Sequence, residues 1–123
     1  MFNNKTILLT GGTGSFGNAF TKYVLTNFTP KKLIIFSRDE NKQYDMQKKF
    51  NNNKLRFFLG DVRDKERLVM AMRDVDYVIH AAAQKHVPIA EYNPIECVKT
   101  NINGAQNIIT ASIQCEVKKV IAL

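Results

Sequence analysis

One short segment, TGGTGSFG at Thr10–Gly17, restricts the possible folds of this chain more than any other feature, and it directly follows the apolar run Thr6–Leu9. Its glycines fit both G-x-G-x-x-G and G-x-x-G-x-x-G. The glycines concerned are Gly11, Gly12, Gly14 and Gly17. Such a turn uses one glycine to leave the strand tightly, one to let backbone approach a pyrophosphate, and one to let the next helix pack on the strand. A helix that begins near Ser15 would offer its free N–H groups to the phosphates. The motif predicts a dinucleotide-binding turn, with a purely structural glycine turn as the alternative.

Strand-like apolar runs alternate with helical periodicity along the chain. The predicted strands are Thr6–Leu9, Leu33–Phe36, Leu55–Leu59, Tyr77–Ile79 and Val120–Leu123. The predicted helices are one near Ser15 with the apolar face Phe16, Ala19, Phe20, Val24 and Phe28, then Asp39–Phe50 with a stripe of Tyr44, Met46 and Phe50, Asp64–Met72, and Pro94–Cys115. This alternation indicates a parallel sheet with helices on both faces. We therefore expect one α/β domain over residues 1–123, a Rossmann-like doubly wound parallel sheet with strand order 3-2-1-4-5, truncated after the fifth strand.

The composition excludes several classes of protein. The 123 residues are 45% hydrophobic and 24% charged, as in an ordinary globular domain, and the net charge is +7. The 18 basic residues are scattered, without interleaved aromatics, so we expect no nucleic-acid partner, although a positive field would attract an anionic small molecule. No apolar run reaches the roughly 20 residues of a membrane span, and no signal peptide is present, so we expect no membrane partner and a cytoplasmic location.

The end of the second predicted strand bears on which dinucleotide would bind. An NAD-preferring site places a carboxylate about 20 residues after the glycines, to accept from the ribose 2′-OH. This chain has Ser37-Arg38 there, and a hydroxyl with a guanidinium suits a 2′-phosphate. We expect NADP, with NAD as second choice because Asp39 follows. The alternative is that Ser37 and Glu40 form a capping box at the start of the second helix.

The next two strand ends complete the predicted pocket. Asp61 would accept from the adenine amino group while Val62 packs on the ring; the alternative for Asp61 is a cap for the helix after Asp64. Small residues follow the fourth strand, where the nicotinamide end would pass close to backbone; plain packing would explain them equally well. These residues are Ala81, Ala82 and Ala83. Lys85 and His86 come next and would face cofactor or substrate, unless they form a solvated loop.

Six segments together resemble the N-terminal part of the inverting UDP-N-acetylglucosamine 4,6-dehydratases, of the extended short-chain dehydrogenase/reductase superfamily. They are TGGTGSFG, FSRDENKQ, RFFLGDVRDKERL, DVDYVIHAAAQKHVPIAEYNP, CVKTNINGAQN and VKKVIAL, and the match runs over all 123 residues. The resemblance implies a tightly held NADP and a UDP-GlcNAc substrate, on a route to pseudaminic acid or related bacterial surface sugars. The cofactor would take hydride from C4 and return it to C6 after loss of water, with inversion at C5.

The resemblance also implies roles for individual residues. The phosphate turn would comprise Thr13, Gly14, Ser15 and Phe16; the clamp for the phosphorylated adenosine ribose would comprise Ser37, Arg38, Asp39, Glu40 and Lys42; the adenine site Asp61 and Val62; and the cofactor wall Ala82. Lys85 would face both cofactor and substrate. Asn101 resembles the helix asparagine that orders backbone and water beneath the active site, with an ordinary polar helix position as the alternative.

The family's catalytic Asp, Lys and Tyr would follow Leu123, so we expect no catalytic residue in this chain and no turnover by residues 1–123 alone. A sheet cut after its fifth strand would leave Val120–Leu123 as an unprotected edge, and we therefore expect a homo-oligomer. Three alternatives stay open. The chain would otherwise be a stand-alone dinucleotide-binding module, part of another NAD(P)-dependent nucleotide-sugar epimerase or dehydratase, or a basic domain whose target is nucleic acid.

Overall fold

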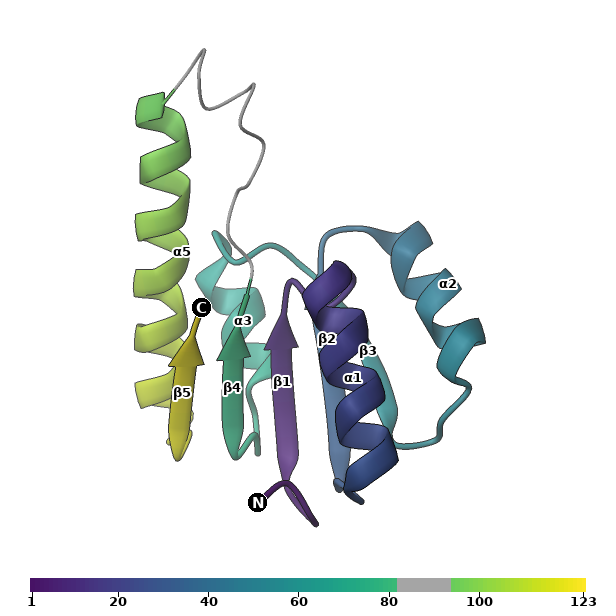
Figure 1. The fold of residues 1–123 in the computed structure, drawn as a ribbon. Coiled ribbons are helices and arrows are strands. Elements are labelled where there is room, and N and C mark those ends of the chain that lie inside the picture. The colour runs from purple at the N-terminus through teal and green to yellow at the C-terminus, as the bar shows by residue number, and fades with distance from the viewer. Residues whose placement is uncertain (82–93) are drawn as a thin grey trace.

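The computed structural model describes residues 1–81 and 94–123, and over 94–103 it describes the backbone alone. Strands and helices alternate in these residues (Figure 1). The strands are β1 (Thr6–Thr10), β2 (Lys32–Ser37), β3 (Leu55–Leu59), β4 (Tyr77–His80) and β5 (Lys119–Ala122). The helices are α1 (Ser15–Asn27), α2 (Glu40–Phe50), α3 (Lys65–Ala71) and α5 (Pro94–Gln114). The predicted elements are therefore confirmed, and their ends shift by a residue at most.

The strands form one parallel sheet in the order β3-β2-β1-β4-β5, which confirms the expected doubly wound fold. β1 lies in the middle, and its last residue, Thr10, is in register with Phe36 on β2 and with His80 on β4. Parallel strands all end at the same edge, so the glycine turn after β1 lies beside the ends of β2 and β4 (Figure 1). The winding direction changes between β1 and β4, which is where ligands bind in open α/β sheets.

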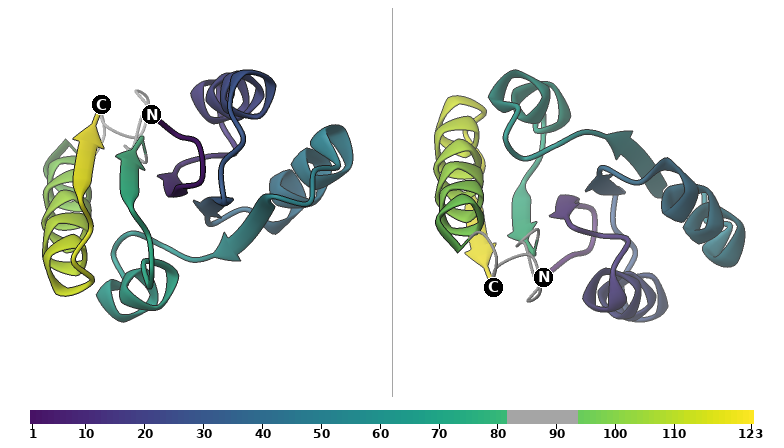
Figure 2. Two further views of the ribbon diagram at one scale, coloured as in Figure 1. Left: turned by 90° about the horizontal axis from the view of Figure 1, so that it is seen from below. Right: turned by 90° about the horizontal axis from the view of Figure 1, so that it is seen from above.

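Helices cover both faces of the sheet, with α1 and α2 on one side and α3 and α5 on the other (Figure 2). Each face has its own apolar core, because successive strand residues point to opposite faces. The core under α1 and α2 comprises Ile7, Leu9, Val24, Leu33, Ile35, Met46, Leu55 and Ile79. The core under α3 and α5 comprises Leu8, Phe36, Val62, Leu68, Ala71, Met72, Val75, Val78, Ile108 and Ala111. No helix in residues 1–81 and 94–123 is long and apolar enough to cross a membrane.

The buried faces of α1 and α2 differ from the predicted ones. On α1, Phe16 and Ala19 are exposed, and Gly17 and Thr21 lie inward with Val24. The reason is close packing, because a Cβ on Gly17 would lie 2.1 Å from the carbonyl oxygen of Gly12, so only small side chains fit between helix and turn.

On α2 the predicted stripe is wrong at one position. Tyr44 is 60% exposed, and Gln43 is buried with Met46 instead. Gln43 and Met46 are three residues apart and therefore share a helix face, whereas Tyr44 lies about 100° further round.

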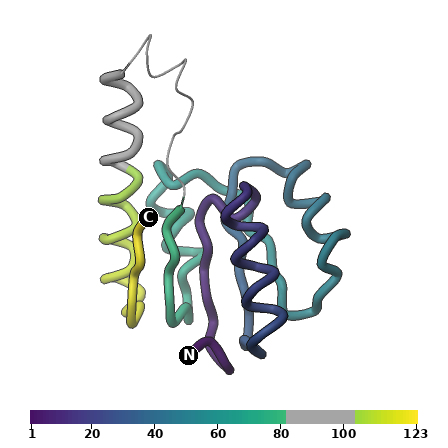
Figure 3. Tube along the Cα trace, in the orientation of Figure 1, coloured from purple at the N-terminus to yellow at the C-terminus, as the bar shows by residue number. Residues whose placement is uncertain are grey.

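The outer strand β5 is an exposed edge. Within the described residues it pairs with β4 alone, and all four of its residues are exposed (Figure 3). Val120 is 37% exposed, Ile121 42% and Leu123 68%, so apolar side chains as well as backbone groups are accessible. The predicted unprotected edge is confirmed. The self-association expected from it stays a prediction.

Candidate dinucleotide-binding site

The glycine turn between β1 and α1 has a shape that requires glycine at Gly11 and Gly17. Gly11 has a positive φ of 67°, and its N–H donates to the Phe36 carbonyl at 3.0 Å, which ties the turn to β2. Gly17 lets α1 pack directly on Gly12. A Cβ on Gly14 would meet nothing closer than 3.7 Å, so the outer side of the turn is open. The predicted tight turn and helix packing are confirmed, and close approach of a pyrophosphate stays a prediction.

The N-terminus of α1 is arranged to receive an anion. Gly14 is the N-cap and has no side chain to cap the helix, and the first turn carries no acidic residue. The first helical hydrogen bond runs from the Asn18 N–H to the Gly14 carbonyl, so Ser15, Phe16 and Gly17 have no acceptor within the helix. Ser15 and Phe16 are exposed. These N–H groups and the positive end of the helix dipole would therefore attract a phosphate.

Asn18 is a site residue that the sequence reasoning missed. Its side-chain amide donates to the carbonyls of Thr13, at 3.2 Å, and Gly14, at 2.9 Å. Both carbonyls belong to the turn, so Asn18 holds the turn in shape without a ligand. An asparagine one residue after the last glycine was the available signal, because its amide is short enough to reach back to its own turn.

At the end of β2, Ser37 is buried and Asp39 caps α2. The Asp39 carboxylate accepts from the Lys42 N–H at 3.0 Å. The alternative that Ser37 starts the helix is therefore wrong, because Ser37 is the last residue of β2 and its carbonyl accepts from the Gly60 N–H at 2.8 Å. Glu40 is the first residue of α2 and is exposed, as is Lys42.

A charged cluster joins the ends of β2 and β3. Asp61 lies 3.8 Å from the Arg38 guanidinium and 2.9 Å from that of Arg63. Burial acts to raise the pKa of Asp61, but hydrogen bonds from Arg63 and the charges of both arginines outweigh it, so the pKa lies below its ordinary value. Asp61 does not cap α3, because Asp64 does so by accepting from the Arg67 N–H at 3.1 Å. The structure thus brings the predicted ribose and adenine residues together.

Val62 also fastens α5. Its side chain is 9% exposed and belongs to the core, where a Cβ on Gly104 would come within 2.9 Å of it. The Asn107 amide donates to the Val62 carbonyl at 3.0 Å. Contact between Val62 and an adenine ring stays a prediction, whereas its packing against α5 is established.

A buried pair of side chains joins the ends of β1 and β4. The Thr10 hydroxyl lies 2.7 Å from His80 Nδ1 and accepts from the Ala81 N–H at 3.1 Å. The hydroxyl can donate to Nδ1 or accept from it, so this contact fits either tautomer of the imidazole. Burial lowers the pKa of His80 below its ordinary value, so the ring is neutral at pH 7. Ala81 is half-buried at the strand end.

Several predicted site residues cannot be placed. Ala82, Ala83, Lys85 and His86 lie outside the described residues. Asn101 lies on α5, where only the backbone is described, so its role stays a prediction.

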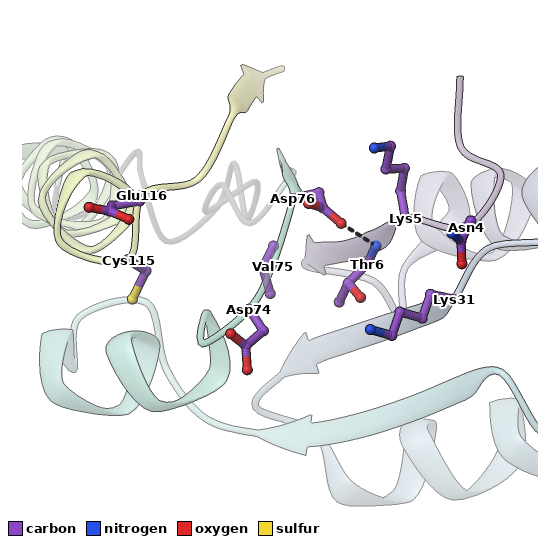
Figure 4. A pocket seen from close by; sticks show the side chains of 9 residues that line it. All are labelled: Asn4, Lys5, Thr6, Lys31, Asp74, Val75, Asp76, Cys115 and Glu116. Carbon is purple, nitrogen blue, oxygen red and sulfur yellow. Dashed lines mark hydrogen bonds between the residues drawn. The ribbon is translucent and has the colours of Figure 1, made fainter.

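Of two hollows on the surface of the described residues, one adjoins the site. The hollow beside the glycine turn, about 230 Å³, is lined by Thr13, Asn18, Lys42, Asp45, Met46 and Lys49. The larger one, about 380 Å³, lies at the opposite edge of the sheet, where Asp76 accepts from the Thr6 N–H at 2.9 Å (Figure 4). Lys118 lies 3.6 Å from the other oxygen of Asp76, so this carboxylate fastens the amino ends of three strands. The hydrogen bond from Thr6, together with nearby lysines, holds the pKa of Asp76 below its ordinary value.

A doubly wound sheet, a preformed glycine turn at its switch point and polar strand ends beside it define a Rossmann-like domain of the dinucleotide-binding class. The model of the polysaccharide biosynthesis protein family matches residues 7–123, and the chain belongs to that family.

The chain spans 37% of the length of the curated dehydratases that it matches. It is 67% identical, over its whole length, to the inverting UDP-N-acetylglucosamine 4,6-dehydratase of Campylobacter jejuni (strain 81-176), and spans 37% of that protein. The structure of Pen from Bacillus thuringiensis matches 99% of this chain with a TM-score of 0.92 and 44% identity, and the match covers 37% of Pen. The dTDP-glucose 4,6-dehydratase DesIV of Streptomyces venezuelae, solved with NAD and TYD bound, matches 94% with a TM-score of 0.83 and 26% identity, over 38% of that enzyme.

Proposed function

We propose that this chain is the cofactor-binding portion of an NADP-dependent UDP-GlcNAc 4,6-dehydratase that inverts at C5. The observation that carries the proposal is the glycine turn, whose open outer side and uncapped helix N-terminus fit a pyrophosphate. The 67% identity to the Campylobacter jejuni dehydratase favours this substrate over other nucleotide sugars. The product would enter the synthesis of bacterial surface sugars such as pseudaminic acid.

The described residues fit the adenosine and pyrophosphate part of a nicotinamide dinucleotide. The N–H groups of Ser15 and Phe16 would bind the pyrophosphate, Ser37 and Arg38 the ribose 2′-phosphate, and Asp61 the adenine amino group. Bound NADP would supply the acceptor and donor of a hydride that leaves and returns to the sugar. The chain spans 37% of its dehydratase relative, so UDP-sugar binding and turnover belong to the longer protein.

The preference for NADP over NAD rests on the end of β2. Arg38 is 67% exposed and its ion pair with Asp61 is long, so the guanidinium can turn toward a phosphate at little cost. Asp39, the one residue there that argues for NAD, already accepts from the Lys42 N–H as the cap of α2. The capping of α2 therefore explains the Asp39 carboxylate, and no contact with a ribose is needed to account for it.

The test is a thermal shift with NADP⁺, NAD⁺ and UDP-GlcNAc added separately at equal concentration, because a ligand that binds only the folded chain raises its melting temperature. We expect the largest rise with NADP⁺, a smaller one with NAD⁺ and none with UDP-GlcNAc alone. No rise with either dinucleotide would refute the proposal. Arg38→Ala should reduce the NADP⁺ shift far more than the NAD⁺ shift, and equal losses would remove the basis for preferring NADP.

A further inference from the structure

We infer that Gln43 is a positioning residue that makes Ser37 a hydrogen-bond donor and so favours a phosphate over a free hydroxyl on the adenosine ribose. The inference rests on the proposed function. It assigns part of the preference for NADP to Gln43, a residue that would not touch the cofactor. Gln43 lies in the first turn of α2, is 7% exposed, and its side chain points at the end of β2.

The orientation of the Gln43 amide is fixed by its surroundings. Its nitrogen lies 2.9 Å from Ser37 Oγ, 3.4 Å from the Ser37 carbonyl oxygen and 3.3 Å from the Phe58 carbonyl oxygen. A carbonyl oxygen only accepts hydrogen bonds, so the amide must present its nitrogen to this group of three atoms. Ser37 Oγ, the closest of them, therefore accepts from Gln43.

This contact decides what the Ser37 hydroxyl can do. A serine hydroxyl has a single proton, and the amide hydrogen that Ser37 accepts keeps that proton directed away from Gln43. The hydroxyl proton is thus available to another acceptor, and Arg38 is the next residue in the chain. The oxygens of a 2′-phosphate accept hydrogen bonds, whereas a free 2′-OH is best recognised by an acceptor such as a carboxylate. A hydroxyl that donates its proton fits the phosphate.

Gln43 also joins the ends of β2 and β3 through its contacts with the Ser37 and Phe58 carbonyls. The experiment must separate this structural role from the positioning role. Gln43→Met keeps the length of the side chain and removes the donor. The ratio of the Kd for NAD⁺ to the Kd for NADP⁺, measured by calorimetry, reports the preference, because a loosened strand end weakens both dinucleotides alike. The matched control is Gln47→Met, the same change at an exposed position one turn further along α2.

We expect Gln43→Met to lower this ratio about fivefold, the worth of one ordinary hydrogen bond, and Gln47→Met to leave it unchanged. In a Ser37→Ala background, Gln43→Met should change the ratio no further, because its effect passes through the serine hydroxyl. If Gln43→Met does not fold, Gln43→Leu is the second variant; it also removes the donor without adding a charge, and should lower the ratio by a similar factor.

Two results would overturn the inference. One is an unchanged ratio of the two Kd values while the affinities for NAD⁺ and NADP⁺ both fall, because this result would show that Gln43 only supports the strand ends. The other is an equal drop in the ratio with and without Ser37. A wild-type chain that binds neither dinucleotide would instead refute the proposed function, so the two failures are distinguishable.

Discussion

Thr21 is the one residue in the described part of the chain whose buried side-chain polar atom has no hydrogen-bond partner. It lies on α1 and is fully buried. Burial of an unpaired hydroxyl lowers the free energy of unfolding, and a methyl group of the same size would avoid that loss.

We therefore expect Thr21→Val to stabilise the chain by about 1 kcal/mol and to raise its melting temperature by about 4 °C. Thr26→Val is the matched control, the same substitution at an exposed position of the same helix, and should change the melting temperature little. Thermal unfolding followed by circular dichroism measures both. A lower melting temperature for Thr21→Val would mean that the hydroxyl has a partner in solution.

Individual residues also show which parts of the site could be predicted from the sequence and which could not. The glycine turn was predictable, because two of its constraints, the positive φ of Gly11 and the contact of Gly17 with Gly12, act within a few residues of the chain. Gln43, by contrast, contacts Phe58 on another strand, and the Thr10–His80 pair joins residues 70 positions apart. Ser37 remained an alternative cap of α2 because the bond that holds Ser37 in the sheet comes from the distant Gly60. Burial of Gln43 had a local signal, its spacing from Met46.

At the scale of the element, the proposed function depends on the charge at the start of α1. Helix N-termini favour negative charge, and α1 has no acidic residue in its first turn to satisfy that preference. A site that must receive a phosphate has to leave this position without a carboxylate. The first turn of α1 thus forgoes a small gain in helix stability.

Ser15→Asp should supply the missing charge and block the site. The melting temperature of the free chain should hold or rise slightly, by the dipole interaction of at most about 1 kcal/mol, while the NADP⁺-induced rise disappears. Ser15→Asn, which is neutral and of similar size, should keep most of that rise. Thermal shifts with and without NADP⁺ provide the measurement, and a full NADP⁺ response from Ser15→Asp would contradict a phosphate site at this helix end.

At the scale of the whole molecule, the prominent surface feature is the β5 edge. Its backbone groups are unpaired on the outer side within the described residues, and Val120 and Ile121 add apolar side chains. Exposed apolar edge strands pair with other chains. The fold was predictable because the sequence of each strand and helix carries a local hydrophobic pattern. The partner that would cover the β5 edge was not predictable, because no local pattern encodes a contact with another surface.

We expect residues 1–123 to self-associate in a concentration-dependent way, and Ile121→Lys to weaken this association by placing a charge on the edge. Ile113→Lys on α5, where the side chain is 74% exposed, should leave it unchanged. Sedimentation velocity over a range of concentrations distinguishes the cases. A wild-type chain that sediments as a monomer throughout would contradict the expectation, and a stronger effect of Ile113→Lys would move the contact to α5.

The central place of β1 has a consequence for how the molecule is made. β1 is the first strand in chain order, yet its neighbours β2 and β4 come later, the second of them only at Tyr77–His80. During synthesis on the ribosome, one edge of β1 therefore stays unpaired until β4 has emerged. The crevice between β1 and β4 forms only after that, so a nascent chain could bind a dinucleotide there only once both neighbours of β1 are in place.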